Sequence, residues 1–361
     1  MLDYNIIFSF ALAYFVAFAT VPIVRVLAFK TDAVDIPKDE RRMHSKPIPR
    51  WGGVAIYIGF IVSVVCFTPV IDIKLLGILS GSLIIVITGI IDDKYAIRAL
   101  LKLLGQVLAA ALVIASGVRI HALNQLLSFV DNPVIIEWFS IIVTFLWIIA
   151  VTNAINLIDG LDGLAASISR ISSFALVFIS LLTGRADMAV VFMAVAGACS
   201  GFLPYNSYPA RIFMGDSGAL FLGYILSTLS IETFFIGYSV MTYIVPVIVL
   251  AIPIFDTSFA IIRRLCTGKG IMSADRGHLH HRLVDMGFSQ KETVTIMSTY
   301  SALLSITAIL LISEGINRAL VLIVVMIFLA VCINLYKTNK NIAKRYMEEL
   351  TKEESGNDEE N

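Results

Sequence analysis

Long apolar runs constrain the fold of this chain more than any other feature. A helix that crosses a bilayer needs about 20 consecutive, mostly apolar residues, and eleven runs of roughly that length follow one another along the chain. They lie near residues 5–29, 52–71, 75–91, 100–120, 134–157, 164–183, 188–204, 217–236, 240–262, 294–313 and 318–336. We therefore predict an all-α, polytopic integral membrane protein with about eleven transmembrane helices. Hydrophobic residues make up 58% of the chain and charged residues 15%, which excludes a large soluble domain.

The runs leave little chain for other domains. Residues 1–336 are expected to form a single multi-span transmembrane domain, and residues 337–361 a charged cytoplasmic tail that ends in several acids. The first run is too long for the apolar part of a signal peptide and lacks a basic segment before it. We expect it to remain as the first span.

The basic residues predict the orientation. The odd-numbered connections and the tail carry 21 lysines and arginines, against four on the opposite side. Because cytoplasmic loops are enriched in Lys and Arg, we place the N-terminus outside and the C-terminus in the cytoplasm.

Net charge and cysteines narrow the functional classes. The chain has 27 basic and 27 acidic residues, so no charge bias points to a nucleic acid. Its four cysteines form no CxxC pair, which indicates neither a disulfide framework nor a zinc site.

Six carboxylates are the most informative polar residues. Each lies at or just inside a helix end, and the assigned topology brings all of them to the cytoplasmic face: Asp92, Asp93, Asp159, Asp162, Asp216 and Asp256. Ionisable groups at membrane depth are costly and usually mark a functional site. An ion relay would place some acids at mid-bilayer, whereas acids gathered on one side favour a cytosolic active site.

Asp92 and Asp93 end the third predicted span as neighbours. Adjacent helical residues point about 100° apart, so the two acids cannot do the same job. One could hold a cation or a substrate phosphate while the other pairs with Lys102 or acts as a base. The alternative is a simple hydrophilic end to an apolar helix.

Asn153, Asn156, Asp159 and Asp162 recur every third residue after the apolar run 141–151. This spacing keeps four oxygen-bearing side chains on one broad face, and the glycines that follow Asp159 and Asp162 allow a ligand to approach the backbone. Such a face suits a divalent cation, sugar hydroxyls or phosphate. A structural polar seam between helices is the alternative.

Two further segments carry polar groups toward the same face. Asp216 lies among small residues where a loop enters the eighth span, although the neighbouring Ser217 could simply cap that helix. The last cytosolic loop contains His278, His280, His281 and Arg282, and its cations suggest capture of a phosphate-rich substrate. A basic loop with incidental histidines is the alternative, and a zinc site is not favoured because no HExxH pattern or cysteine accompanies them.

The segment from Arg42 to Gly53 precedes the second span. It contains His44, two prolines that stiffen the approach, and paired glycines that allow close helix packing. Either a direct substrate role or a plain interfacial position fits this segment.

These motifs, in this order, resemble the polyprenyl-phosphate N-acetylhexosamine-1-phosphate transferases, and the resemblance covers nearly the whole chain. The motifs are the segment 42–53, Asp92-Asp93, Asn153-xx-Asn156-xx-Asp159-Gly-xx-Gly163, Met214-Gly-Asp216-Ser-Gly and His278-Leu-His280-His281-Arg282. The chain is most similar to the branch that starts enterobacterial common antigen, O-antigen or teichoic acid linkage units.

The resemblance implies transfer of GlcNAc-1-phosphate from UDP-GlcNAc to undecaprenyl phosphate, which releases UMP, in the bacterial plasma membrane with the active site facing the cytoplasm. It implies Mg²⁺ as cofactor, with Mn²⁺ as a substitute, and a homodimer in the lipid bilayer. The metal ligands would be Asp216 and Asn156. Asp92 or Asp93 would bind or deprotonate the acceptor phosphate. The expected substrate-binding residues are Lys102, Asn153, Asp159, Asp162, His278, His280, His281, Arg282 and His44.

Several alternatives stay open. A phospho-MurNAc-pentapeptide transferase is the nearer rival, and a secondary transporter is the rival from another class, although we find no internal repeat. Ala96 stands where many relatives have an acid or amide, which puts a sugar contact there in doubt, and Asp256 has no assigned role. Direct attack by the lipid phosphate and a covalent aspartyl-phosphate both fit these residues.

Overall fold

The computed structural model describes residues 4–36, 47–121, 132–235, 240–268, 270, 277–327 and 329–330. His44 and the predicted tail 337–361 lie outside the described residues. Of the last predicted span, 318–336, residue 328 and residues 331–336 also lie outside them.

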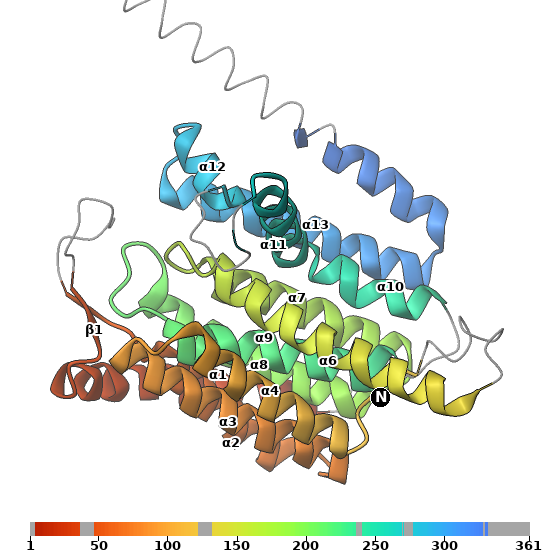
Figure 1. Ribbon diagram of the computed structural model, residues 1–361, viewed down its shortest axis with the longest axis horizontal. Helices are drawn as coiled ribbons and strands as arrows, with labels where there is room; N and C mark the ends of the chain where they lie inside the picture. Colours follow the sequence, from red (N-terminus) through yellow and green to blue (C-terminus); the bar gives the residue numbers. More distant parts are fainter. Residues whose placement is uncertain are drawn as a thin grey trace, which may run out of the picture.

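The described chain is almost entirely helical, as predicted. Its helices are α1 (Tyr4–Lys30), α2 (Gly52–Phe67), α3 (Ile73–Tyr95), α4 (Ala99–Ala115), α6 (Pro133–Ile158), α7 (Leu164–Leu182), α8 (Ala186–Asn206), α9 (Gly215–Phe234), α10 (Val240–Val249), α11 (Ala251–Cys266), α12 (Leu279–Asp285) and α13 (Gln290–Ser313). A further apolar helix covers Ile316–Ile327. Figure 1 shows α1 to α4 in the lower part of the molecule, α6 to α9 in the middle and α10 to α13 above them.

Helix α9 is the centre of the bundle, since every residue from Ser217 to Phe234 is buried. It packs against α2, α3 and α6, and glycines make these contacts close. A Cβ atom on Gly53 would lie 2.0 Å from the backbone nitrogen of Gly218, and one on Gly89 would lie 2.4 Å from that of Ser217. Small residues let helix backbones approach in this way inside membranes, and here they hold the start of α9 against α2 and α3.

Seven helices among the described residues are long and apolar enough to span a membrane: α1, α3, α6, α7, α8, α9 and α13. Helices α2 and α4, with 16 and 17 residues, and the helix Ile316–Ile327 are apolar but shorter. The structure therefore supports a polytopic membrane protein, whereas the expected number of about eleven spans remains a prediction.

The predicted single span 240–262 is wrong in one respect, because the chain there forms two helices. Helices α10 and α11 meet at Leu250 with a bend of 79°. Pro246 lies inside α10 and Pro253 inside the first turn of α11. Proline cannot donate a backbone hydrogen bond and its ring collides with the preceding turn, so two prolines seven residues apart favour a break between them.

A short antiparallel ribbon of β1 (Val34–Asp35) and β2 (Ile48–Pro49) was not predicted from the sequence. The Phe213 N–H donates to the carbonyl of Pro49 at 2.8 Å, and the Gly52 N–H donates to the carbonyl of Phe213 at 3.0 Å. These bonds tie the ribbon to the loop that leads into α9. In Figure 1 the ribbon, this loop and α12 lie at the same end of the molecule.

Candidate active site

The two adjacent acids at the end of α3 have different partners, as their helical spacing predicts. Asp93 Oδ1 accepts the backbone N–H of Asp216 at 2.8 Å and Asp93 Oδ2 accepts that of Ser217 at 3.1 Å. The first turn of a helix has N–H groups without intrahelical acceptors and a partial positive charge. Asp93 therefore caps α9 from the neighbouring helix, and Ser217 does not need to cap it.

Asp92, which is buried, instead joins a charge cluster with the half-buried Lys102 and Asp216. The ammonium of Lys102 lies 2.6 Å from Asp92 Oδ2 and 2.5 Å from Asp216 Oδ2. Asn156 Nδ2 donates to Asp216 Oδ1 at 3.0 Å. Residues from α3, α4, α6 and α9 thus meet at one point, and one lysine stands between two carboxylates.

Asn153 lies one turn before Asn156 on α6, but it faces another helix. Its Nδ2 donates to Gln106 Oε1 at 2.7 Å and to the carbonyl of Ile149 at 2.8 Å, and Gln106 Nε2 returns a bond of 3.3 Å. Gln106 follows Lys102 by one turn of α4. The amide pair therefore fixes α4 against α6 beside the cluster, which for Asn153 agrees with the alternative of a structural polar seam between helices.

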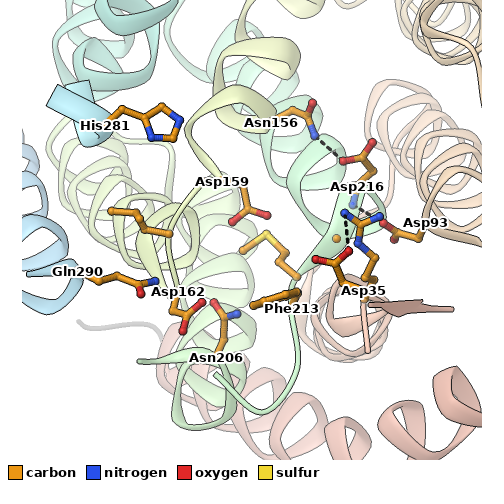
Figure 2. A pocket seen from close by; sticks show the side chains of 15 residues that line it. Asp35, Asp93, Asn156, Asp159, Asp162, Asn206, Phe213, Asp216, His281 and Gln290 are labelled. Carbon is orange, nitrogen blue, oxygen red and sulfur yellow. Dashed lines mark hydrogen bonds and ion pairs between the residues drawn. The ribbon is translucent and has the colours of Figure 1, made fainter. Parts of the chain in front are cut away.

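A cavity of about 310 Å³ opens beside this cluster. Figure 2 shows Asp159 in the middle of the cavity wall, Asp216, Asp93 and Asp35 on one side, and His281 and Gln290 on the other. The lining residues are Asp35, Arg50, Asp93, Asn156, Asp159, Gly160, Leu161, Asp162, Asn206, Phe213, Met214, Gly215, Asp216, His281 and Gln290. Five of them are aspartates, so the cavity favours cations and needs positive charge before it can hold a phosphate.

Asp159 and Asp162 contribute differently to this wall. Loss of water around the carboxyl group, with the nearby charges of Asp216 and Asp162, raises the pKa of Asp159 to about 7. Asp162 Oδ2 accepts the backbone N–H of Ala210 at 2.9 Å. Asp162 thereby fixes the loop between α8 and α9, while Asp159 is poised to change its charge near neutral pH.

The histidine motif at the start of α12 is held by Asp256, which answers the open question about that residue. Asp256 Oδ2 lies 2.8 Å from His278 Nδ1, and Asp256 Oδ1 accepts the backbone N–H of Leu279 at 2.6 Å. The side chains of Asp256 and His278 are buried. Asp256 therefore positions the motif, and it favours the tautomer of His278 with the proton on Nδ1.

The three histidines have different surroundings. His280 packs on Gly160, where a Cβ atom would lie 2.4 Å from its Nε2, and burial together with the charge of His281 lowers the pKa of His280 to about 4. His281 lines the cavity. Arg282 is exposed and is not among the lining residues, so its predicted contact with a diphosphate stays a prediction.

Four lining residues with polar side chains were not singled out from the sequence as site residues: Asp35, Arg50, Asn206 and Gln290. Arg50 was part of a quoted motif and could have been found there. Asp35 and Gln290 carry no motif signal of their own, because the ribbon and the start of α13 bring them to the cavity.

The charge cluster fits a divalent cation. Among the described residues no three His, Cys, Asp or Glu side chains converge on one point, but Mg²⁺ usually takes only one or two carboxylates and completes its shell with substrate phosphates and water. Within the part of the chain that the structure describes, no hydrogen-bond donor faces the buried Asp92 Oδ1, which is costly unless a positive charge compensates it. Asp216 and the amide of Asn156 supply two further oxygen-bearing side chains beside it.

Comparison with known proteins agrees with this geometry. The model of the family "Glycosyl transferase family 4" matches residues 75–234, the stretch that holds α3 to α9. The chain is 38% identical to the "Probable undecaprenyl-phosphate N-acetylglucosaminyl 1-phosphate transferase" of Bacillus subtilis (strain 168), over 91% of both chains. It is 34% identical to the "Decaprenyl-phosphate N-acetylglucosaminephosphotransferase" of Mycolicibacterium smegmatis, over 79% of this chain and 77% of the relative.

A more distant relative represents the nearer rival activity. The "Phospho-N-acetylmuramoyl-pentapeptide-transferase" of Clostridium beijerinckii is 29% identical over 79% of this chain and 89% of the relative. Identity above 30% over most of the chain, together with the family match, is sufficient for assignment, and the chain belongs to glycosyl transferase family 4.

Proposed function

We propose that this protein transfers GlcNAc-1-phosphate from UDP-GlcNAc to undecaprenyl phosphate, which gives undecaprenyl-diphosphate-GlcNAc and UMP. The observation that carries the proposal is the cluster of Asp92, Lys102 and Asp216 at the edge of a carboxylate-lined cavity. The name of the Bacillus subtilis relative, which aligns over 91% of both chains, supports the sugar and the acceptor.

The chemistry needs charge neutralisation more than a strong covalent catalyst. An oxygen of the acceptor phosphate attacks the β-phosphorus of the donor, and the bond from that phosphorus to UMP breaks. Attacking, transferred and leaving groups are all anionic, so positioning and electrostatic stabilisation carry most of the catalysis. Lys102 would stabilise this charge, and Asp92, which lies 2.6 Å from the Lys102 ammonium, would accept the acceptor's proton. Asp93 acts through α9, because it fixes the position of Asp216.

Mg²⁺ would be held by Asp216 and Asn156, with Asp92 beside them. When bound, the ion supplies positive charge to the donor diphosphate. Asn156 would have to turn its amide oxygen toward the ion, by a rotation of the amide group that replaces the present bond from its nitrogen to Asp216.

The site is proposed to face the cytoplasm. The excess of lysines and arginines on the side of the six acids supports this orientation, and so does the donor, which is a water-soluble nucleotide sugar. With this topology we propose a multi-pass enzyme of the bacterial plasma membrane.

Purified protein in detergent tests the proposal with two donors in parallel. We expect sugar from UDP-GlcNAc, but not from UDP-MurNAc-pentapeptide, to enter the lipid phase when undecaprenyl phosphate and Mg²⁺ are present. EDTA should stop the reaction and added Mg²⁺ restore it. Asp216→Asn should lower kcat by at least about a hundredfold in a protein that elutes as the wild type from size exclusion. Transfer from UDP-MurNAc-pentapeptide alone, or full activity of Asp216→Asn, contradicts the proposal.

A further inference from the structure

The cavity has too few fixed positive charges for a doubly anionic ligand. Its lining contains five aspartates, and within the described chain Arg50 is the one lysine or arginine among the lining residues. Backbone N–H groups face Asp93 and Asp162 and compensate these two acids. A phosphate group that enters still faces Asp35 and Asp159, together with Asp216, whose charge the Lys102 ammonium partly neutralises. A nearby guanidinium therefore has a large influence on its binding.

The backbone of Arg50 is fixed beside the start of α9. Its N–H donates to the carbonyl of Ala33 at 3.1 Å, across the ribbon. Its own carbonyl lies against Gly215, where a Cβ atom would come within 2.0 Å of it, and Gly215 has a φ of +71° that favours glycine. The side chain of Arg50 therefore starts from a defined point at the wall of the cavity.

The guanidinium retains capacity for a ligand. Its Nη2 lies 3.9 Å from Asp35 Oδ1, which is an ion pair longer than a hydrogen bond, and its side chain is 40% exposed. A planar fork of N–H donors matches the geometry of a phosphate group and can form two parallel bonds to it. Asp35 therefore orients the guanidinium of Arg50 at the cavity wall without forming a short hydrogen bond to the Nη2 atom of the pair.

We propose that Arg50 binds the diphosphate of the nucleotide-sugar donor. The inference rests on the proposed function. The donor is favoured over the lipid because Arg50 lies in the connection between β2 and α2, outside the membrane-spanning helices, and is exposed to water. Arg50 is thus a substrate-binding residue, and its ion-pair partner Asp35 lies on the side of the cavity opposite His281 (Figure 2).

Donor and acceptor kinetics test this assignment. Arg50→Ala should raise the donor KM by at least about tenfold, because a hydrogen-bonded charge pair is lost, and should change the acceptor KM by less than about twofold. Arg50→Lys keeps the charge but not the fork and should fall between the two. Arg98→Ala removes an exposed arginine at the start of α4 that does not line the cavity and is the matched control with wild-type constants.

A purely structural role of Arg50 predicts another pattern. If Arg50 only held the ribbon through Asp35, Asp35→Asn would break the same ion pair and raise the donor KM as much as Arg50→Ala. We expect a clearly smaller change in Asp35→Asn. The increase in Tm on addition of UDP-GlcNAc, compared between wild type and each variant, measures donor binding without turnover.

The outcomes separate this inference from the proposed function. A wild-type protein that transfers GlcNAc-1-phosphate while Arg50→Ala keeps the wild-type donor KM overturns the role of Arg50 alone. A rise in the acceptor KM without a rise in the donor KM also overturns it. A folded wild-type protein that transfers nothing from UDP-GlcNAc defeats the proposed function instead.

Discussion

Exchange of the two neighbouring aspartates for asparagine, one at a time, should separate stability from catalysis. Asp93→Asn retains one acceptor oxygen and replaces the other by an NH₂ group, which faces a backbone N–H of α9. The variant loses one hydrogen bond to a charged group, about 1.5–3 kcal/mol, and the attraction between a carboxylate and a helix N-terminus, about 0.3–1 kcal/mol. We expect a loss of about 2–4 kcal/mol in the free energy of unfolding.

Asp92→Asn should have the opposite profile. Lys102 keeps its ion pair with Asp216 at 2.5 Å, so the fold loses less, about 1 kcal/mol or below. Turnover should fall by at least about a hundredfold, because the carboxylate proposed to accept the acceptor's proton is gone. In Asp93→Asn, turnover also falls, but only because the start of α9 shifts and displaces Asp216.

Unfolding and activity should be measured on the same preparations. Thermal unfolding in detergent, followed by tryptophan fluorescence, gives Tm, and transfer of labelled sugar into lipid gives kcat. The control is Asp72→Asn, which keeps an N-cap oxygen at the far end of α3. Equal Tm values for wild type and Asp93→Asn, or a larger drop in Asp92→Asn than in Asp93→Asn, would refute the assignment of Asp93 as the cap of α9.

Three further predictions concern the histidine motif. Gly160→Ala places a methyl group 2.4 Å from His280 Nε2 and should cost about 1–3 kcal/mol of stability and raise the donor KM. The control is Gly270→Ala, whose methyl group meets no described residue within 4 Å. Equal Tm values for the two variants would contradict the contact between Gly160 and His280. Asp256→Asn weakens the hydrogen bond to His278 and should lower kcat at least about tenfold and Tm by a few degrees. Unchanged kinetics would show that the histidine motif does not depend on Asp256 for its position. The pKa of His280 is about 4 in the folded protein and about 6.5 in the unfolded chain, so the unfolded state binds more protons below pH 6.5. The free energy of unfolding should therefore fall by about 2 kcal/mol between pH 7.5 and pH 5. His280→Asn should remove this part of the pH dependence, which unfolding curves at both pH values can check.

Much of this architecture could be predicted from hydropathy. A span is a long local pattern, so its position is readable, and the seven longest spans fall where the apolar runs predicted them. The bend between α10 and α11 was not predicted, although the sequence contains Pro246 and Pro253. The reason is that the hydropathy of an apolar run does not show whether the run forms one helix or two. The β1–β2 ribbon was not predicted because strands of two residues have no detectable periodicity of polar and apolar residues.

The site shows a similar division. The polar motifs of the sequence meet at one end of the molecule, and the different directions of Asp92 and Asp93 followed from helix geometry. The partners did not follow, since they depend on which helices are neighbours. Three contacts illustrate this: Asp93 caps α9, Asp256 holds His278, and Gln106 pairs with Asn153. Each joins residues that lie 22 to 123 positions apart in the sequence.

The fate of the donor's β-phosphate tests the central claim most directly. The protein should be incubated with undecaprenyl phosphate, Mg²⁺ and UDP-GlcNAc that carries ³²P at the β-phosphate and ³H in the sugar, and the lipid and aqueous phases should then be counted. The account predicts that both labels enter the lipid in the donor's own ratio and that unlabelled UMP is the nucleotide released. Tritium in the lipid without ³²P, with labelled UDP in the water, would mean that the sugar alone is transferred and would contradict the account.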